Sequence, residues 1–271
     1  MIRARKRFGQ HFLEPVWVEK VIKAIAPQPE QDFIEIGPGP GALTFPLTQR
    51  AKSVLAFEID RDLASELEVN APPNLTIVPG DFLERGISDF RLQTSDLSRL
   101  LRVAGNLPYN VASPIMFRLV ELHAAGVPLV DATLMLQREV ADRLVAGPGS
   151  KEYGVLSILI QHRANVETVL KLPAGAFRPP PKVLSSLVRL RFREARPAVR
   201  DAAMFQRIVH AVFTRRRKTM ANALLALDDG GPSQLRPAEA LAAAGLDGSR
   251  RPETLSIAEF ASLADAYVLP R

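Results

Sequence analysis

The stretch DFIEIGPGPGA, residues 32–42, joins a short apolar run to a glycine-rich loop. An apolar run that ends in glycine is typical of a buried strand, and the residues after the loop leave room for a helix. Gly37, Gly39, Gly41 and Ala42 satisfy the loose pattern G-x-G-x-x-G/A, in which a strand turns tightly into a helix. The stretch therefore predicts the first strand–loop–helix unit of an α/β fold.

Similar apolar runs recur along the chain, with helix-like segments between them. Strands are expected at 32–37, 53–60, 75–81, 102–108 and 132–137, and helices at 15–26, 112–124 and 138–146. Strands that alternate with helices predict a mostly parallel sheet covered on both faces. Two later strands, at 164–172 and 185–193, flank the proline-rich FRPPPKV, and we expect antiparallel pairing there.

Beyond residue 195 the sequence has no further strand signal. Helical stretches follow at about 201–213, 215–227, 237–245 and 256–267. We therefore expect two domains. Residues 1–195 form an α/β domain that begins with a basic arm, and residues 196–271 form a small all-helical domain.

The composition indicates a globular chain with a basic surface. Of its 271 residues 47% are hydrophobic, which is enough for a sizeable core. Lys and Arg number 35 against 29 Asp and Glu, so the net charge is +6. Much of the excess is clustered, and basic clusters favour a polyanionic partner such as nucleic acid, with a solvated charged surface as the alternative.

Several classes of site and location are disfavoured by what the sequence lacks. It contains no cysteine, which excludes disulfides and thiolate chemistry and makes the cytoplasm the simplest compartment. His123, His162 and His210 fall in helix-like stretches without ligand spacing, so no metal site is expected. The start of the chain is basic but lacks the apolar core of a secretory signal, and no apolar run predicts a membrane span.

The glycine loop has two interpretations besides a turn without a ligand. Glu58, at the end of the second strand, lies about 20 residues on, where an acid binds ribose hydroxyls, so a nicotinamide oxidoreductase is one candidate. However, Pro38 and Pro40 have no backbone N–H, which removes donors that a pyrophosphate would need. S-adenosylmethionine, which has no phosphate, is a better match, with Asp81 at the end of the third strand accepting from the adenine amino group.

The stretch GNLPYNV, residues 105–111, follows the fourth predicted strand. An exocyclic amine of adenine is a poor nucleophile because its lone pair is delocalised into the ring. The side-chain carbonyl of Asn106 and the backbone carbonyl of Pro108 offer two acceptors that would localise this lone pair, and Tyr109 offers a face for the base. The alternative is a proline turn with Tyr109 in the core.

Taken in order, these motifs resemble one family over essentially the whole chain. They are RKRFGQHFL, EIGPGPGALT, FEID, GD, GNLPYNVASPIMF, MLQREVADRLVAGPGSKEYGVLS, FRPPPKVLSS and FTRRRKTMANAL, with RPETLSIAEF at 251–260. The set is similar to the ribosomal RNA adenine dimethyltransferases. The long match through 135–157 resembles the bacterial small-subunit enzyme more closely than the resistance methyltransferases that act on large-subunit RNA.

The resemblance implies a Rossmann-like S-adenosylmethionine-dependent methyltransferase that acts in ribosome biogenesis. It implies transfer of two methyl groups to N6 of each of two adjacent adenines, in a hairpin near the 3′ end of small-subunit ribosomal RNA. The implied cofactor-binding residues are His11, Leu13, Gly37, Gly39, Glu58, Asp81 and Asn106. The implied target-amine pocket is Asn106, Leu107, Pro108 and Tyr109, with Phe177 as a second aromatic against the base. Phe177 has an alternative role as a core residue, and His11 departs from the asparagine of many relatives.

The basic clusters fit an RNA partner. Arg3, Arg5, Lys6 and Arg7 lie in the arm, and Arg215, Arg216, Arg217 and Lys218 are expected to begin a helix of the small domain. Such groups contact phosphates without reading sequence. We expect a monomer that acts on an immature small subunit. A binding factor for ribosome assembly and a DNA adenine methyltransferase remain as alternatives.

Overall fold

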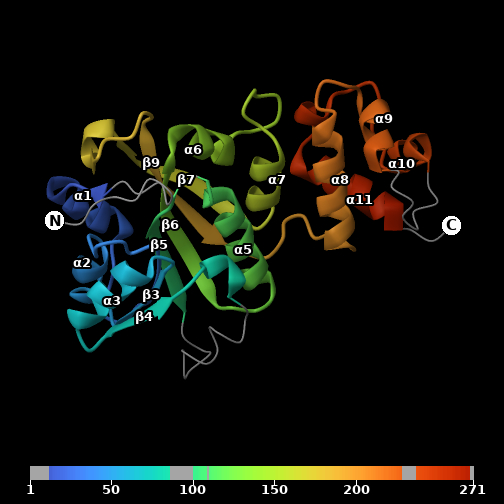
Figure 1. Ribbon diagram of the computed structural model, residues 1–271. Helices are drawn as coiled ribbons and strands as arrows, with labels where there is room; N and C mark the ends of the chain where they lie inside the picture. The colour runs from blue at the N-terminus through green and yellow to red at the C-terminus, as the bar shows by residue number, and fades with distance from the viewer. Residues whose placement is uncertain (1–11, 86–99, 109, 228–235, 269–271) are drawn as a thin grey trace. The chain divides into compact units, whose positions relative to one another are not determined.

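The computed structural model describes residues 12–85, 100–108, 110–227 and 236–268 (Figure 1). The chain forms two compact units. The first comprises Met1–Ala141 and Asn165–Phe192, and the second comprises Asp142–Ala164 and Arg193–Arg271. The second unit thus includes a segment that lies well before residue 195, besides the chain that follows Phe192. From the sequence we expect residues 1–195 to bind S-adenosylmethionine and carry the catalytic site and residues 196–271 to contact RNA, and this division stays a prediction.

The first unit is built on a sheet that has seven strands among the described residues, in the order β4-β3-β2-β5-β6-β9-β7. The strands are β2 Asp32–Ile36, β3 Ser53–Glu58, β4 Leu75–Pro79, β5 Leu101–Asn106, β6 Leu129–Gln137, β7 Ala164–Leu172 and β9 Ser185–Phe192. The neighbours from β4 to β6 are parallel, and β9 is antiparallel to β6. The predicted mostly parallel sheet with a late antiparallel strand is confirmed.

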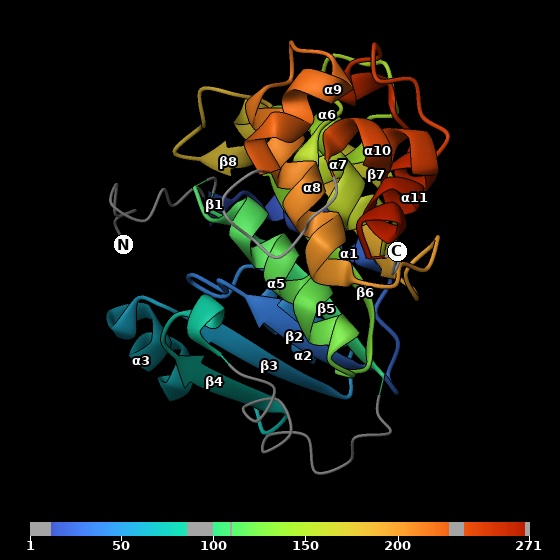
Figure 2. The same ribbon diagram turned by 90° about the vertical axis from the view of Figure 1, so that its right-hand side faces the viewer.

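Helices cover both faces of this sheet, as Figures 1 and 2 show. They are α1 Pro15–Ile25, α2 Thr44–Thr48, α3 Arg61–Val69 and α5 Ala112–Ala124. A short antiparallel pair, β1 Phe12–Leu13 with β8 Phe177–Arg178, lies beside them. The spacing of Val21, Ile22 and Ile25 buries one side of α1 against the sheet.

One hydrophobic cluster identifies the face of the sheet that α1 and α2 cover. It contains α1 and α2 residues together with Phe33 of β2, Ala104 of β5, Met135 of β6 and Phe177 of β8. Successive side chains of a strand point to opposite faces, so residues two positions further along each strand lie on this same face. We call it the α1 face.

The second unit is helical. Its elements are part of α6 Arg138–Val145, then α7 Val155–Gln161, α8 Ala202–Thr214, α9 Met220–Ala223, α10 Pro237–Ala243 and α11 Ile257–Val268, with 3-10 turns η4 Leu224–Leu227 and η5 Pro252–Thr254. The carboxylate of Asp201 caps α8 by accepting from the amides of Ala203 and Met204. Phe205 of α8 and Phe260 of α11 are fully buried and contribute to the core.

One predicted helix is wrong in its start. The sequence predicts a helix over 215–227, but α8 ends at Thr214 and the chain turns before α9 begins at Met220. The amide of Lys218 donates to the carbonyl of Arg215, which closes the turn. Arg216 is held there by an ion pair with Glu253, a contact that a local pattern cannot reveal. The basic cluster 215–218 therefore lies in a turn and not on a helix.

Neither a membrane-spanning helix nor a cluster of potential metal ligands occurs among the described residues. None of the helices in this part of the chain has the length and apolar character needed to span a membrane. The same part contains no group of three or more potential metal-binding side chains.

Candidate active site

The glycine loop leaves the end of β2 in a conformation that glycine favours. Gly37, Gly39 and Gly41 have φ angles of +69°, +57° and +89°, values that other residues rarely adopt. The amide of Gly37 donates to the carbonyl of Phe57 at 2.9 Å, so the loop is attached to β3 at its first residue. The sequence pattern therefore marks a loop whose shape depends on its glycines.

Glu58, at the end of β3, anchors this loop. Its Oε2 accepts from the amide of Gly39 at 2.9 Å, and its Oε1 accepts from the amide of Asp60 at 2.9 Å. Burial raises the pKa of Glu58, and these two amides oppose the rise. Each carboxylate oxygen has a second lone pair, so Glu58 can accept from a ligand hydroxyl without releasing the loop.

Glu35 is a site residue that the sequence reasoning missed. It is 1% exposed near the carboxyl end of β2, and its Oε2 has no hydrogen-bond partner among the described residues. Burial raises the pKa of Glu35 to about 8, with the nearby charge of Glu58 as a smaller cause in the same direction and the Thr44 hydroxyl opposing them. The available signal was an acid in the centre of an apolar run.

Asn106, Leu107 and Pro108 follow the end of β5, the strand between β2 and β6. A Cβ on Gly105 would lie 2.7 Å from the carbonyl oxygen of Ile36, so only glycine allows β5 to approach β2 this closely. The amide of Leu107 donates to Met135 at 3.3 Å, and the carbonyl of Pro108 accepts from Val111 at 3.1 Å. This turn places Asn106 and Pro108 at the carboxyl end of the sheet.

The β1–β8 pair brings the end of the arm to the same region. Leu13 pairs with Phe177, and the Phe12 ring would lie 3.6 Å from a Cβ on Gly39. Phe177 is 4% exposed and belongs to the hydrophobic cluster of the α1 face, together with Leu13. In this structure Phe177 is a core residue next to the site, and its contact with a target base stays a prediction.

Asp81 follows the end of β4, the third strand expected from the sequence. Its Oδ1 accepts from the amide of Leu83 at 2.9 Å and thereby caps the 3-10 turn η2, Phe82–Glu84. Phe82 is buried edge-on against Phe57, with ring centroids 5.4 Å apart. Asp81 thus has a structural role, and its half-exposed carboxylate retains acceptor capacity for a ligand.

Strand alternation places the principal polar groups on one face. Phe33, Ala56 and Ala104 all belong to the cluster of the α1 face. Glu35, Glu58 and Asn106 each lie two positions further along the same strands, and therefore share that face. The carboxyl ends of parallel strands in such sheets are where ligands bind. The structure thus assembles two carboxylates, the glycine loop and Asn106 at one rim of one face.

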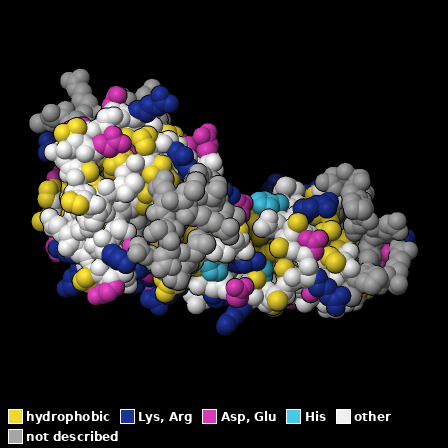
Figure 3. Space-filling view, turned by 90° about the horizontal axis from the view of Figure 1, so that it is seen from below, with side chains coloured by type: hydrophobic (Ala, Val, Ile, Leu, Met, Phe, Trp, Pro, Cys, Tyr) yellow, Lys and Arg dark blue, Asp and Glu magenta, His cyan; other side chains and the backbone are white. Residues whose placement is uncertain are grey.

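Several predicted residues lie outside the described part of the chain. They are His11 and Tyr109 of the site, and Arg3, Arg5, Lys6 and Arg7 of the arm. In the second cluster, Arg216 is half-buried and pairs with Glu253 at 2.8 Å, whereas Arg215, Arg217 and Lys218 are exposed. Arg215 also donates to the carbonyl of Asn222. On the face shown in Figure 3, acidic and basic side chains of the described residues are intermingled.

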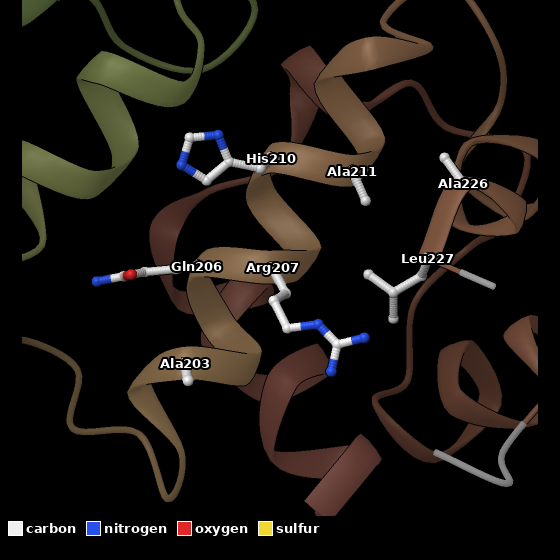
Figure 4. Close-up of a pocket in the computed structure, with 7 residues that line it drawn as sticks. All are labelled: Ala203, Gln206, Arg207, His210, Ala211, Ala226 and Leu227. Atoms are coloured by element: carbon white, nitrogen blue, oxygen red, sulfur yellow. The ribbon is translucent and has the colours of Figure 1, made fainter. Parts of the chain in front are cut away.

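A separate cavity of about 340 Å³ lies in the second unit, between α8 and η4. Its lining comprises Ala203, Gln206, Arg207, His210, Ala211, Ala226 and Leu227. In Figure 4 Gln206 and His210 point to one side of α8, whereas Arg207 extends on the side of Leu227. Because these polar groups do not converge on one point, the cavity offers no catalytic arrangement.

Known proteins resemble this chain over nearly its whole length. The model of the ribosomal RNA adenine dimethylase family matches residues 1–267. Ribosomal RNA small subunit methyltransferase A of Acinetobacter baylyi is 43% identical over 272 residues, 98% of this chain and 93% of that protein. The crystal structure of a dimethyladenosine transferase from Plasmodium falciparum has a TM-score of 0.74 at 24% identity, covering 93% of this chain and 96% of that chain. That of the 23S rRNA methyltransferase ErmE has a TM-score of 0.64 at 25% identity, covering 95% and 100%. The chain therefore belongs to the ribosomal RNA adenine dimethylase family and is an S-adenosylmethionine-dependent rRNA adenine dimethyltransferase.

Proposed function

We propose that this enzyme dimethylates N6 of two adjacent adenines in a hairpin near the 3′ end of small-subunit ribosomal RNA. The observation that carries the proposal is the placement of Glu35, Glu58 and Asn106 on one face and at one rim of the sheet. The small subunit as substrate is supported by the name of the Acinetobacter relative, which covers nearly the whole chain. We further propose that the enzyme acts as a cytoplasmic monomer on an immature subunit.

The residues at the rim fit S-adenosylmethionine. The cofactor has a positively charged amino group, and the unpartnered Oε2 of Glu35 is a buried acceptor that such a group satisfies. Glu58 would accept from the ribose hydroxyls, and Asp81 from the adenine amino group. The loop between them would contact no phosphate group of this cofactor, which agrees with the absence of backbone N–H donors at Pro38 and Pro40.

The bound cofactor supplies an electrophilic methyl group on a sulfonium. The protein's task is to orient the target amine, because the delocalised lone pair of N6 is a weak nucleophile. The carbonyl of Asn106 and a backbone carbonyl of the Leu107–Pro108 turn would accept the two amine hydrogens, which localises the lone pair toward the methyl group. With the cofactor bound, the localised lone pair would bond to the methyl carbon, the sulfonium sulfur would keep the electrons of its bond to that carbon, and the amine would release one proton to water.

Arg217 and Lys218 are exposed, and so is Arg215, whose guanidinium also donates to the carbonyl of Asn222. We propose that Arg217 and Lys218 contact RNA phosphates, since exposed guanidinium and ammonium groups bind the phosphate oxygens of a nucleic-acid backbone. Arg216 is a weaker candidate because its guanidinium already binds Glu253 and the carbonyl of Ser150.

Methyl transfer to defined RNA tests the proposal. Purified protein is incubated with methyl-tritiated S-adenosylmethionine and small subunits from cells that lack this modification, and the labelled nucleosides are identified. We expect N6,N6-dimethyladenosine at two adjacent positions near the 3′ end of the RNA. Asn106→Ala is expected to lower the rate by at least about 100-fold while retaining most of the cofactor affinity. Label that appears only in large-subunit RNA or DNA would contradict the small-subunit assignment.

A further inference from the structure

Gln137 is the last residue of β6, the strand beside β5. Asn106 of β5 is in register with Met135 of β6, and Met135 belongs to the cluster of the α1 face that contains Phe177. Gln137 lies two residues beyond Met135 in the β6–β9 ladder, so its side chain shares the face of Asn106. Neighbouring strands lie about 4.8 Å apart and a strand rises about 3.3 Å per residue, so the Cα atoms of Asn106 and Gln137 are expected about 8 Å apart, within reach of a long side chain.

The carboxamide of Gln137 has no structural task in the described part of the chain. Gln161 donates to the carbonyls of Leu144 and Ala146, and Gln31 accepts from Arg102, so these two glutamines support the fold. Gln137 is half-buried, and none of the described residues forms a hydrogen bond with its side chain. Gln137 immediately precedes α6, but the first amide of that helix does not need its side chain. That amide, of Arg138, donates to the carbonyl of Leu184.

We propose that Gln137 reads the ring of the target adenine by donating a hydrogen bond to N1 or N7, the two acceptors that flank the amine. The inference rests on the proposed function, because Asn106 must hold that amine. The carboxamide of glutamine matches this edge, since Asn and Gln recognise adenine through N6 and N7 in nucleic-acid complexes. Here Asn106 and the turn take the amine, and Gln137 takes the ring nitrogen.

The contact between Gln137 and a ring nitrogen matters most for the second methyl transfer. The amine starts with two hydrogens, and the first transfer leaves one, so one of its two hydrogen bonds is lost. The ring nitrogens do not change between the two transfers. A hydrogen bond from Gln137 therefore holds the monomethylated base in position when the contacts to the amine are weaker. Its loss should slow the second transfer more than the first.

The test uses the full-length enzyme and small subunits reconstituted with a synthetic 3′ RNA segment. Gln137→Met keeps the length of the side chain and removes its donor, and Gln137→Asn keeps the amide and shortens its reach. Gln28→Met is the matched control, because Gln28 is exposed and precedes the opposite, amino end of β2. Each enzyme is assayed on adenine, 7-deazaadenine and 1-deazaadenine at the target position, and cofactor affinity is measured by calorimetry.

We expect Gln137→Met to bind the cofactor like wild type, to lose about tenfold in kcat/KM for the first transfer, as one hydrogen bond implies, and to accumulate N6-methyladenosine. Wild type should lose about tenfold on one deaza substrate, and Gln137→Met should lose nothing further on it. Wild-type enzyme that is indifferent to both deaza substrates overturns the inference even if the variants fold poorly. So does a Gln137→Met variant that dimethylates at the wild-type rate. Absence of any transfer by wild type to adenine refutes the proposed function instead.

Discussion

Replacement of Glu35 by glutamine should change how the stability of the cofactor-free enzyme depends on pH. Glu35 is buried in β2 with one carboxylate oxygen unpartnered, and burial raises its pKa from 4.5 to about 8. In the unfolded chain the carboxyl titrates near its ordinary value. The folded protein therefore binds one more proton than the unfolded chain between about pH 4.5 and pH 8.

The sign and size of the effect follow from that difference. A group whose pKa is raised on folding stabilises the protein fully below the unfolded pKa, and this contribution is lost as the pH rises through the folded pKa. The shift from 4.5 to about 8 corresponds to at most about 5 kcal/mol, at 1.36 kcal/mol for each pKa unit. Wild type should lose up to this amount between pH 4.5 and 8, and Glu35→Gln should not. Above pH 8 the glutamine variant should be the more stable protein by a few kcal/mol.

Urea unfolding of the cofactor-free proteins at pH 5, 6, 7, 8 and 9 measures the difference directly. Glu19→Gln is the matched control, since the exposed Glu19 forms a surface ion pair with Arg50 and its replacement should shift stability by less than about 1 kcal/mol at every pH. If the free-energy difference between Glu35→Gln and wild type stays constant from pH 5 to 9, the buried, protonated state of Glu35 is refuted. The same variant should bind S-adenosylmethionine about 10- to 100-fold more weakly by calorimetry, because a charge-assisted hydrogen bond is lost.

Three further predictions concern the framework and the basic turn. Arg102→Ala should destabilise the enzyme by about 3 kcal/mol or more in urea unfolding, because it leaves the carboxylate of Asp131, now 2.8 Å from the guanidinium, buried without this partner; unchanged stability would contradict the pairing. Gly105→Ala should cost about 1–3 kcal/mol in the same assay, since its Cβ would lie 2.7 Å from a carbonyl oxygen of β2. Arg216→Ala should lower stability by up to about 1 kcal/mol, because it removes the ion pair with Glu253. Arg217→Ala should leave stability unchanged and reduce the slope of log K for RNA binding against log salt concentration by about 1. Equal effects of the two arginines on RNA affinity would refute their assignment to different tasks.

The fold was predictable from sequence because its main determinants are local. The apolar run 32–36 and the glycines after it specify a strand and a loop with positive φ angles, and both are observed. The later strands 164–172 and 185–192 were also visible from their composition. The start of the helix predicted at 215 was wrong: a turn lies there, and its Arg216 binds Glu253, which lies 37 residues away in the sequence.

The candidate site was predictable only in part, for a related reason. Glycine loops, Glu58 and Asn106 belong to recognisable local patterns. Glu35 lies inside a strand, where the pattern alone favours an apolar residue, and Gln137 lies at the end of a strand. Whether these side chains lie beside the other site residues depends on which strands become neighbours. The burial of Phe177 is also a property of the assembled β1–β8 pair, which joins residues far apart in the chain.

The alternation of side chains along the strands explains why one rim can hold both the methyl donor and its acceptor. Glu35 on β2 lies between Ala56 on β3 and Ala104 on β5, so small residues flank the buried carboxylate in the sheet. One step closer to the rim on the same face, Glu58 and Asn106 lie on either side of the glycine loop. The order β3-β2-β5-β6 then runs from the proposed ribose acceptor Glu58 to the loop, to the proposed amine acceptor Asn106, and to the amide of Gln137. In the proposed arrangement a methyl group crosses only the boundary between β2 and β5, where the absence of a side chain on Gly105 leaves room for the carbonyl of Ile36.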